Sequence, residues 1–413
     1  MNKLKNNNFF CELLQYLIVI IVILECNSIY SQIYGYHLIT RCIMTALASV
    51  SLIYLIKQKK TKTNKNIFII YDILCSFFML INTNNFSGYG VIILVFLIFL
   101  PLLMIYLSNL TKDELKKFVQ KFIDVVIVIS LISVIFWVVI LLFKLKPTDS
   151  IKIVWAKPYS VIQSYFNIYF NTQDVWWITG TSLMRNTGIF AEGPMYSAIL
   201  VVALIFNNLL NFENTKSNFI KTCILFITMI STISVTGIIC SIIIIAANIR
   251  EYASSLKKNY RKVFAVGLLI MVICMAPIGL KFLSKKLETS SAGHRNMDIR
   301  NGLNAFLEEP LLGHGINHER KTEDDYKVGY GYSNTIIPVI TDGGILLGII
   351  YVLPMILLVI EGCKKKKFNY LVFSSIFIIL LFTTLIQYRL IMMLLISISY
   401  CLAYDKNFVE RDV

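Results

Sequence analysis

Apolar residues occupy most of this chain, in long runs separated by shorter polar segments. The runs cover residues 10–29, 37–56, 67–82, 90–108, 122–143, 194–210, 219–233, 235–249, 263–283, 340–360, 369–386 and 390–404. Most of them, coiled as helices, are long enough to cross a hydrocarbon core of roughly 30 Å. The pattern predicts an all-α, polytopic membrane protein with about twelve transmembrane helices. It also predicts a single integral membrane domain over residues 1–413.

The pattern has to be interrupted at two places. Residues 219–249 would form one helix of about 46 Å, which is too long for a single crossing. We therefore predict a break at the polar cluster of residues 234–237. The last two runs are separated by residues 387–389, whose polar groups would be costly at mid-membrane.

Composition and charge agree with a membrane protein and set its orientation. The chain is 57% hydrophobic and 15% charged, where a soluble domain carries about 25% charged residues. Most of its 39 Lys and Arg residues lie in short segments after alternate runs. The positive-inside rule places these segments and both termini in the cytoplasm. The basic clusters are thus expected to contact anionic lipid and not nucleic acid.

The same orientation leaves two long loops on the outer side, at residues 144–193 and 284–333. The first is rich in Trp, Tyr and Phe, which suit either anchoring at the membrane interface or stacking against sugar rings. In the second, residues 294–309 place apolar side chains on one helical face, which predicts an amphipathic helix on the outer leaflet. We expect the function to lie in these loops and between the helices.

The first loop ends with Arg185, Gly188, Phe190, Glu192 and Pro194. Pro194 suits the first turn of a helix, and the carboxylate before it suits the positive end of the helix dipole. Glu192 has two interpretations, a helix cap or a carboxylate base. An outward Arg185 would offer a planar fork of donors for phosphate oxygens.

The second loop contributes His294, Arg295, Arg300 and His314. On a straight helix the two arginines would point about 140° apart, so they should not both face one phosphate. Each arginine could bind substrate or anchor the helix to headgroups. The spacing from His314 to His318 would suit a helical metal site, but glycines on both sides of His314 argue against a helix. A loop-ordering role is favoured, and no metal is expected.

The run that begins near residue 340 adds Asn334 and, within the run, Asp342 followed by two glycines. An Asp in an apolar run is by default functional or paired, and the alternative is that it caps a broken helix.

Three motifs in this order, between these runs, resemble the O-antigen and capsule polysaccharide polymerase (Wzy-type) family and the related O-antigen ligases. They are Arg185-x-x-Gly188-x-Phe190-x-Glu192-x-Pro194, Pro310-x-x-Gly313-x-Gly315, and Ser333-Asn334 with Asp342-Gly343-Gly344. The resemblance covers about residues 185–350. The ligases have a histidine ahead of the Asn, where this chain has Ser333, and this favours a polymerase.

The resemblance implies a glycosyltransferase at the outer face of the bacterial inner membrane. Its donor would be a polyprenyl-diphosphate-linked oligosaccharide, and its catalytic residues Glu192, as the base, and Arg185. Its substrate-binding residues would be Arg185, His294, Arg295, Arg300, His314, Asn334 and Asp342. No cofactor is expected, and the implied partners are membrane lipid, a chain-length regulator and a flippase. Two alternatives are a ligase that moves finished glycan and a flippase or transporter. A transporter should show related halves and charges at mid-membrane, whereas Arg41 is the only obvious base within a run.

Overall fold

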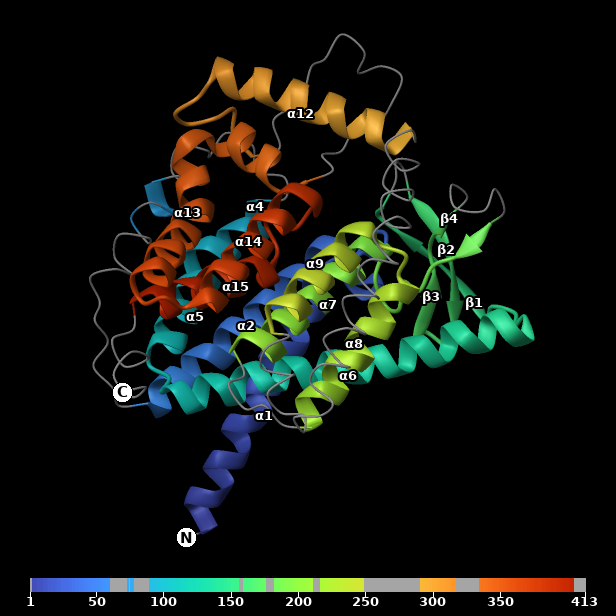
Figure 1. The fold of residues 1–413 in the computed structure, drawn as a ribbon, viewed down its shortest axis with the longest axis horizontal. Coiled ribbons are helices and arrows are strands. Elements are labelled where there is room, and N and C mark those ends of the chain that lie inside the picture. Colours follow the sequence, from blue (N-terminus) through green and yellow to red (C-terminus); the bar gives the residue numbers. More distant parts are fainter. Residues whose placement is uncertain are drawn as a thin grey trace, which may run out of the picture. The chain divides into compact units, whose positions relative to one another are not determined.

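The computed structural model describes residues 2–59, 73, 75–77, 89–155, 159–175, 182–210, 216–248, 290–316 and 334–404. It is mostly helical, as the hydropathy pattern predicts (Figure 1). The amino-terminal half contains α1 (Asn2–Glu25), the short 3-10 helix η1 (Ile29–Ser31), α2 (His37–Gln58), α4 (Tyr89–Ile93), the π-helix η2 (Leu94–Phe99), α5 (Leu100–Ser108) and α6 (Lys112–Phe143). The carboxy-terminal half contains α7 (Gly193–Ile205), the π-helix η3 (Phe206–Leu210), α8 (Lys216–Ser231), α9 (Val235–Ala247), α12 (Ser290–Glu308), α13 (Ile336–Lys364), α14 (Phe368–Thr383) and α15 (Leu390–Tyr404).

Several of these helices have the length and composition of membrane spans. Among the described residues, five stretches are long and apolar enough to cross: Asn8–Glu25, His37–Gln58, Gly90–Ser108, Lys112–Phe143 and Ile336–Lys364. Shorter apolar helices cover Gly193–Leu209, Val235–Ala247, Phe368–Thr383 and Leu390–Ala403. The predicted run 263–283 and most of 67–82 lie outside the described residues. The number twelve therefore stays a prediction.

Side-chain burial shows which solvent these helices are built for. On α2 the exposed face carries Ile39, Ile43, Leu47 and Val50, spaced by three or four residues, and the buried face includes Thr45, Ala48 and Ser49. On α6, Ile135 is 60% exposed while Ser130 and Ser133 are buried. Membrane helices often bury small and polar residues and expose large apolar ones, because lipid is as apolar as the side chains that face it. Both helices are therefore suited to lipid and not to water.

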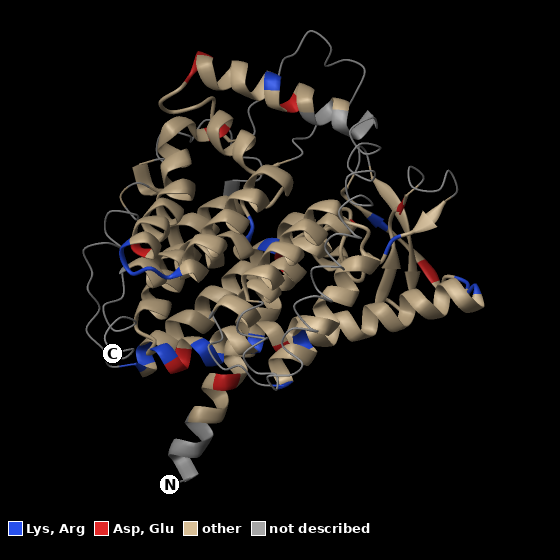
Figure 2. Ribbon diagram, viewed as in Figure 1, with Lys and Arg blue, Asp and Glu red and all other residues tan. Residues whose placement is uncertain are grey.

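Charge is concentrated at helix ends. The lysines of α6 lie in its first three turns, and after Asp124 the helix carries no charged residue (Figure 2). Near the start of α6, Glu114 forms an ion pair of 2.5 Å with Lys59, the residue that follows α2. The end of α2 and the start of α6 are both predicted to face the cytoplasm. Their contact is compatible with that assignment.

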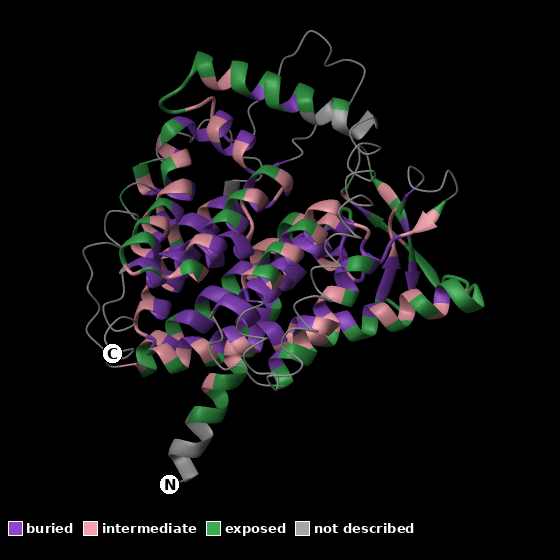
Figure 3. Cartoon of the chain, in the orientation of Figure 1, coloured by how far each residue is buried: buried purple, intermediate pink, exposed green. Residues whose placement is uncertain are grey.

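The described chain divides into two compact units. The first comprises Met1–Val125, Lys152–Ser160 and Asp298–Val413, and the second comprises Val126–Ile151 and Val161–Met297. In the first unit α13, α14 and α15 pack against one another, and α15 also packs on α1 and α5. In the second unit α7 packs between α8 and α9 and is buried along nearly its whole length (Figure 3). Apolar helices form both units, so the division does not separate a soluble domain from a membrane domain.

The first long loop departs from the all-α prediction. It forms a three-stranded sheet in the order β1-β2-β3, from β1 (Asp149–Ile153), β2 (Ser160–Tyr165) and β3 (Tyr169–Asn171). A second, two-stranded sheet joins β4 (Asp174–Val175) to β5 (Leu183–Met184). Strands β2 and β3 are antiparallel, with Ser164 opposite Phe170. The strands are short and rich in aromatic residues, so they show no clear alternation of apolar and polar positions in the sequence.

The predicted amphipathic helix is present as α12. Ile299, Leu303 and Leu307 share one face and are exposed, whereas Asp298 and Gly302 are buried on the other side. The helix therefore carries an uncovered apolar face, as the sequence pattern predicts.

The break predicted inside residues 219–249 is also present. Helix α8 ends at Ser231 and α9 begins at Val235, and the Ser234 hydroxyl accepts a hydrogen bond from Gly237 N at 3.4 Å. Ser234 is thus the amino-terminal cap of α9.

Candidate functional site

Arg185 lies between β5 and α7 and is almost completely buried. Its Nε donates to the carbonyl of Thr232 at 2.9 Å, Nη2 donates to that of Ile233 at 3.1 Å, and Nη1 donates to Oε1 of Gln173 at 2.9 Å. Thr232 and Ile233 follow the last residue of α8, where carbonyls lack helical partners and a cation is favoured. Arg185 therefore holds the break between α8 and α9 in shape.

Gly193 stands between Glu192 and Pro194 because of this arginine. A Cβ atom at Gly193 would lie 2.8 Å from Nε of Arg185 and 3.0 Å from the carbonyl oxygen of Thr232. Any larger residue would push the guanidinium group away from the carbonyls that it binds.

The remaining motif residues close the turn into α7. Gly188 has a φ of 55°, which glycine adopts without strain. The ring of Phe190 stacks on that of Tyr196 with centroids 5.1 Å apart. The Tyr196 hydroxyl lies 2.7 Å from the hydroxyl of Ser133 on α6. The motif thus ties its own turn to the buried core of the second unit.

Glu192 is the amino-terminal cap residue of α7, but only through its backbone. Its carbonyl accepts from Tyr196 N at 3.2 Å, and within the described residues its side chain makes no capping hydrogen bond. Burial lowers the pKa of Arg185 to about 10, and the charge of Glu192 opposes that shift. Glu192 therefore interacts electrostatically with Arg185 and does not cap the helix with its carboxylate. Its role as a base stays a prediction.

The two glycine motifs of the first unit, about thirty residues apart in sequence, form one structure. The segment that follows α12 packs on a break in α13, where Gly344 has a non-helical conformation. Three backbone N–H groups donate across this contact: His314 N to the Thr341 carbonyl at 2.8 Å, Gly315 N to that of Asp342 at 2.9 Å, and Ile345 N to that of Pro310 at 2.8 Å. We call this contact the glycine junction.

Glycine is required on both sides of the glycine junction. Gly313 has a φ of 69°, and a Cβ atom there would lie 2.5 Å from the backbone nitrogen of Gly343. Gly344 has a φ of 57°, and its Cβ atom would lie 2.5 Å from the carbonyl carbon of Leu311. Any side chain at either position would force the two backbones apart.

Asp342 is buried at the glycine junction, and its Oδ2 accepts a hydrogen bond of 2.7 Å from the hydroxyl of Tyr388. Asn334 is also buried, and its Oδ1 accepts from Ile337 N at 3.0 Å. Asn334 thus caps the start of α13. Asp342 also lies two residues before the break in α13, so both interpretations of its sequence context stay predictions.

Tyr388 belongs to the connection between α14 and α15, residues 384–389, whose backbone is not helical. Side chains from other elements donate to its carbonyls: Thr335 to Thr384 at 2.5 Å, Asn27 to Leu385 at 3.4 Å, Tyr351 to Gln387, and Arg41 to Tyr388 at 3.1 Å. Irregular backbone between apolar helices requires such partners, because lipid offers none. The connection is therefore held by α1, α2 and α13 together.

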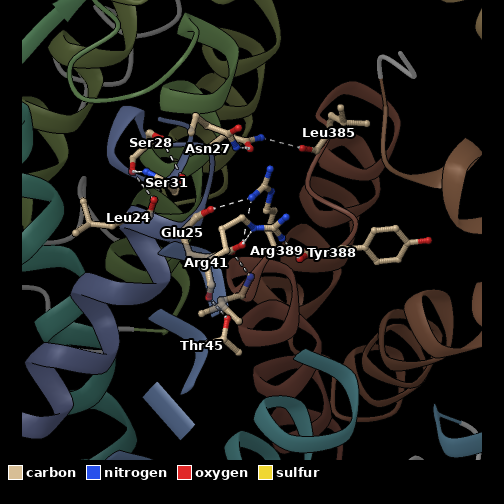
Figure 4. A network of polar contacts seen from close by, with 12 residues as sticks. Leu24, Glu25, Asn27, Ser28, Ser31, Arg41, Thr45, Leu385, Tyr388 and Arg389 are labelled. Carbon is tan, nitrogen blue, oxygen red and sulfur yellow. Dashed lines mark hydrogen bonds and ion pairs between the residues drawn. The ribbon is translucent and has the colours of Figure 1, made fainter. Parts of the chain in front are cut away.

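The centre of this arrangement is a cluster of three charged side chains, Glu25, Arg41 and Arg389, which we call the arginine cluster (Figure 4). Oε1 of Glu25 accepts from Arg41 Nε at 2.6 Å and from Arg389 Nη1 at 3.2 Å. Its Oε2 accepts from Leu390 N at 2.9 Å. Burial, reinforced by the charge of Arg41, lowers the pKa of Arg389 to about 10. In Figure 4 the ring of Tyr388 points away from the ion pairs.

The other predicted site residues are placed as follows. His314 borders the glycine junction, with Nε2 2.8 Å from the Ala305 carbonyl and 3.7 Å from Oε2 of Glu308. Arg300 is exposed on α12. His294 and Arg295 lie in the same helix, but their side chains are outside the described residues. The structure thus brings His314 and Asp342 together at the glycine junction and Arg185 together with Glu192 in the second unit, whereas the side chain of Asn334 accepts its hydrogen bond from the first turn of α13.

The sequence interpretation missed the arginine cluster. Glu25, Arg41 and Arg389 are single charges at the ends of apolar runs, and ionisable residues in such places are by default functional or paired. That rule marks the three residues as candidates, but it does not predict that they contact one another. Among the described residues, no group of three or more His, Cys, Asp or Glu side chains is arranged to hold a metal ion. His318 lies outside them.

Comparisons of the chain with protein-family models, with curated proteins and with solved structures gave no match.

Proposed function

We propose that this protein is a polysaccharide polymerase of the cytoplasmic membrane, which joins lipid-diphosphate-linked oligosaccharide units at the outer face. One observation carries the proposal. Two of the three motifs on which the family resemblance rests are the two halves of the glycine junction, and the buried carboxylate of Asp342 lies within it. Because each motif can pack in this way only when the other is present, the two motifs are expected to occur together in one chain.

The proposed topology has about twelve crossings with both termini in the cytoplasm of a bacterial cell. In the first unit, the helix ends that this topology assigns to the outer face meet. They are the end of α1, the starts of α2 and α13, and the connection between α14 and α15. This meeting supports the proposed alternation of the helices, and in the proposed orientation the arginine cluster and Asp342 lie on the outer side.

In the proposed reaction, a hydroxyl oxygen of the acceptor sugar attacks the anomeric carbon of the donor sugar. The bond from that carbon to the diphosphate oxygen breaks, and polyprenyl diphosphate leaves with the electron pair. Glu192 takes the hydroxyl proton. Arginine side chains stabilise the charge that develops on the diphosphate, which in a water-poor site is a large contribution. No metal has to be invoked for this charge balance.

A second candidate, a flippase for the same lipid-linked units, is favoured by the arginine cluster itself. Ionisable residues buried among membrane helices mark transport pathways as well as catalytic sites. Both candidates handle a lipid diphosphate, and they differ in the side of the membrane on which substrate accumulates when the protein is lost.

Deletion of the gene and analysis of the lipid-linked glycan separates the candidates. A polymerase deletion should accumulate single repeat units that are accessible from outside. Full-length polymer that is not attached to its acceptor would indicate a ligase, and repeat units trapped inside would indicate a flippase. Either of these results contradicts the proposal.

Complementation of the deletion tests Glu192. Glu192→Gln should make no polymer at normal protein abundance, because it cannot take a proton. Glu192→Asp, shorter by one methylene, should be strongly impaired. The matched control is Glu309→Gln, an exposed position next to α12, which should restore wild-type polymer. Wild-type polymer from Glu192→Gln would remove Glu192 from the reaction and make Asp342 the next carboxylate to test.

A further inference from the structure

We propose that Arg41 and Arg389 bind the diphosphate group of a polyprenyl-diphosphate lipid, with Glu25 holding the two guanidinium groups in position. The identity of the ligand rests on the proposed function, and flippase activity would require the same ligand.

The charge of the arginine cluster is unbalanced. Two guanidinium groups share the carboxylate of Glu25, so the three side chains carry one positive charge in excess. An uncompensated charge in a dry site is unfavourable, and an anion that joins the cluster removes this cost.

The open side of the cluster presents cations. The Glu25 side chain has no exposed surface, whereas those of Arg41 and Arg389 remain 13% and 15% exposed. An anion that approaches from that side therefore meets the guanidinium groups and not the carboxylate. Each planar guanidinium has five N–H donors, and two such forks suit the several oxygens of a diphosphate better than those of a monophosphate.

A histidine adds a further polar group at the same place. His37 opens α2 one turn before Arg41, and it lies within electrostatic range of both arginines. Its Nδ1 is buried and has no hydrogen-bond partner among the described residues. A buried polar atom without a partner is rare, and a bound ligand would explain it.

The arginine cluster is also connected to the glycine junction. Tyr388 receives the Arg41 hydrogen bond on its carbonyl and donates from its hydroxyl to Asp342. A diphosphate held by the arginines would therefore lie one tyrosine side chain away from a buried carboxylate.

The test measures binding of a polyprenyl diphosphate to the purified full-length protein in lipid nanodiscs. Arg41→Gln and Arg389→Gln should each weaken binding by about tenfold or more, equivalent to ~1.4 kcal/mol. Glu25→Gln removes the competing negative charge but keeps an amide oxygen that can accept from both arginines, so it should bind at least as tightly as wild type. Lys59→Gln is the matched control, because it breaks an ion pair at the other end of α2 and should not change affinity.

A ligand site predicts that the arginine variants lose affinity for the diphosphate and that Glu25→Gln does not. A purely structural network predicts that all three variants behave alike. If all three variants lose affinity in step with thermal stability, or if both arginine variants bind like wild type, the proposal is wrong. Arg41→Lys and Arg389→Lys keep the charge and protect against misfolding, and they should still bind more weakly because the fork is lost.

Competition identifies the source of the phosphate. A polyprenyl monophosphate and an anionic phospholipid should compete poorly, and equal competition by the phospholipid would make this a headgroup site and overturn the proposal. The result is independent of the polymer assay. Loss of diphosphate binding in the arginine variants supports the site even if gene deletion points to a flippase, and unchanged binding refutes it even if the protein is a polymerase.

Discussion

The clearest energetic prediction concerns Arg185, whose three donor nitrogens all bind protein oxygens. Replacing it with alanine removes three charge-assisted hydrogen bonds and leaves the Thr232 and Ile233 carbonyls without their partner. A charged hydrogen bond contributes about 1.5–3 kcal/mol, and a buried acceptor left unpaired costs about 1–3 kcal/mol. Because the contributions overlap and water can enter the gap, we expect Arg185→Ala to destabilise the fold by about 3–5 kcal/mol.

The assay is thermal unfolding of the purified protein in detergent, followed by tryptophan fluorescence. Trp137 is a suitable local reporter, because its Nε1 donates to the Met184 carbonyl at 3.1 Å, next to Arg185. At roughly 2–4 °C per kcal/mol, the expected fall in Tm is on the order of 10 °C. Arg300→Ala is the matched control, since that arginine is exposed on α12 and its loss should change stability by less than about 0.5 kcal/mol.

Two outcomes would refute the reasoning about Arg185. Unfolding of Arg185→Ala at the wild-type temperature would mean that the hydrogen bonds to α8 contribute little. Wild-type stability together with lost diphosphate binding would make Arg185 a ligand-binding residue, as its sequence context first indicated. Arg185→Lys should be intermediate, because an ammonium group cannot reach three divergent acceptors.

Two further predictions test the glycine junction and the topology. Gly313→Ala should lower the free energy of unfolding by about 2–4 kcal/mol and abolish polymer, because it combines a left-handed φ with a backbone clash. The control Gly293→Ala, in open space on α12, should raise the free energy of unfolding by up to about 1 kcal/mol. Equal melting temperatures for the two variants would contradict the close packing at the glycine junction. The topology is tested in a variant without the nine native cysteines, into which single cysteines are introduced. A cysteine at Trp155 should be labelled from outside, and one at Lys365 only after permeabilisation. Labelling of both from the same side would exclude the topology.

Local features of the sequence determined most of the helices. Runs of apolar residues gave the positions of α2, α6, α13 and α15, because a backbone surrounded by lipid must satisfy its hydrogen bonds within a helix. The break at Ser234 and the apolar face of α12 were also predictable, since each depends on residues within a few turns of one another. The small sheets of residues 149–184 were not, because their short strands do not produce a readable alternation.

Only the tertiary structure decided what the candidate residues contact. Arg185 was predicted to lie in a loop that precedes a membrane helix, and it lies between β5 and α7, but the carbonyls that it binds are 47 and 48 residues away. Gly313 and Gly344 were recognised as separate motifs, and their close approach depends on how the segment after α12 meets α13. Glu25 and Arg389 are 364 residues apart in sequence. Hydropathy and helical periodicity report only on neighbours within a few turns, whereas ion pairs of this kind exist only after the helices have packed.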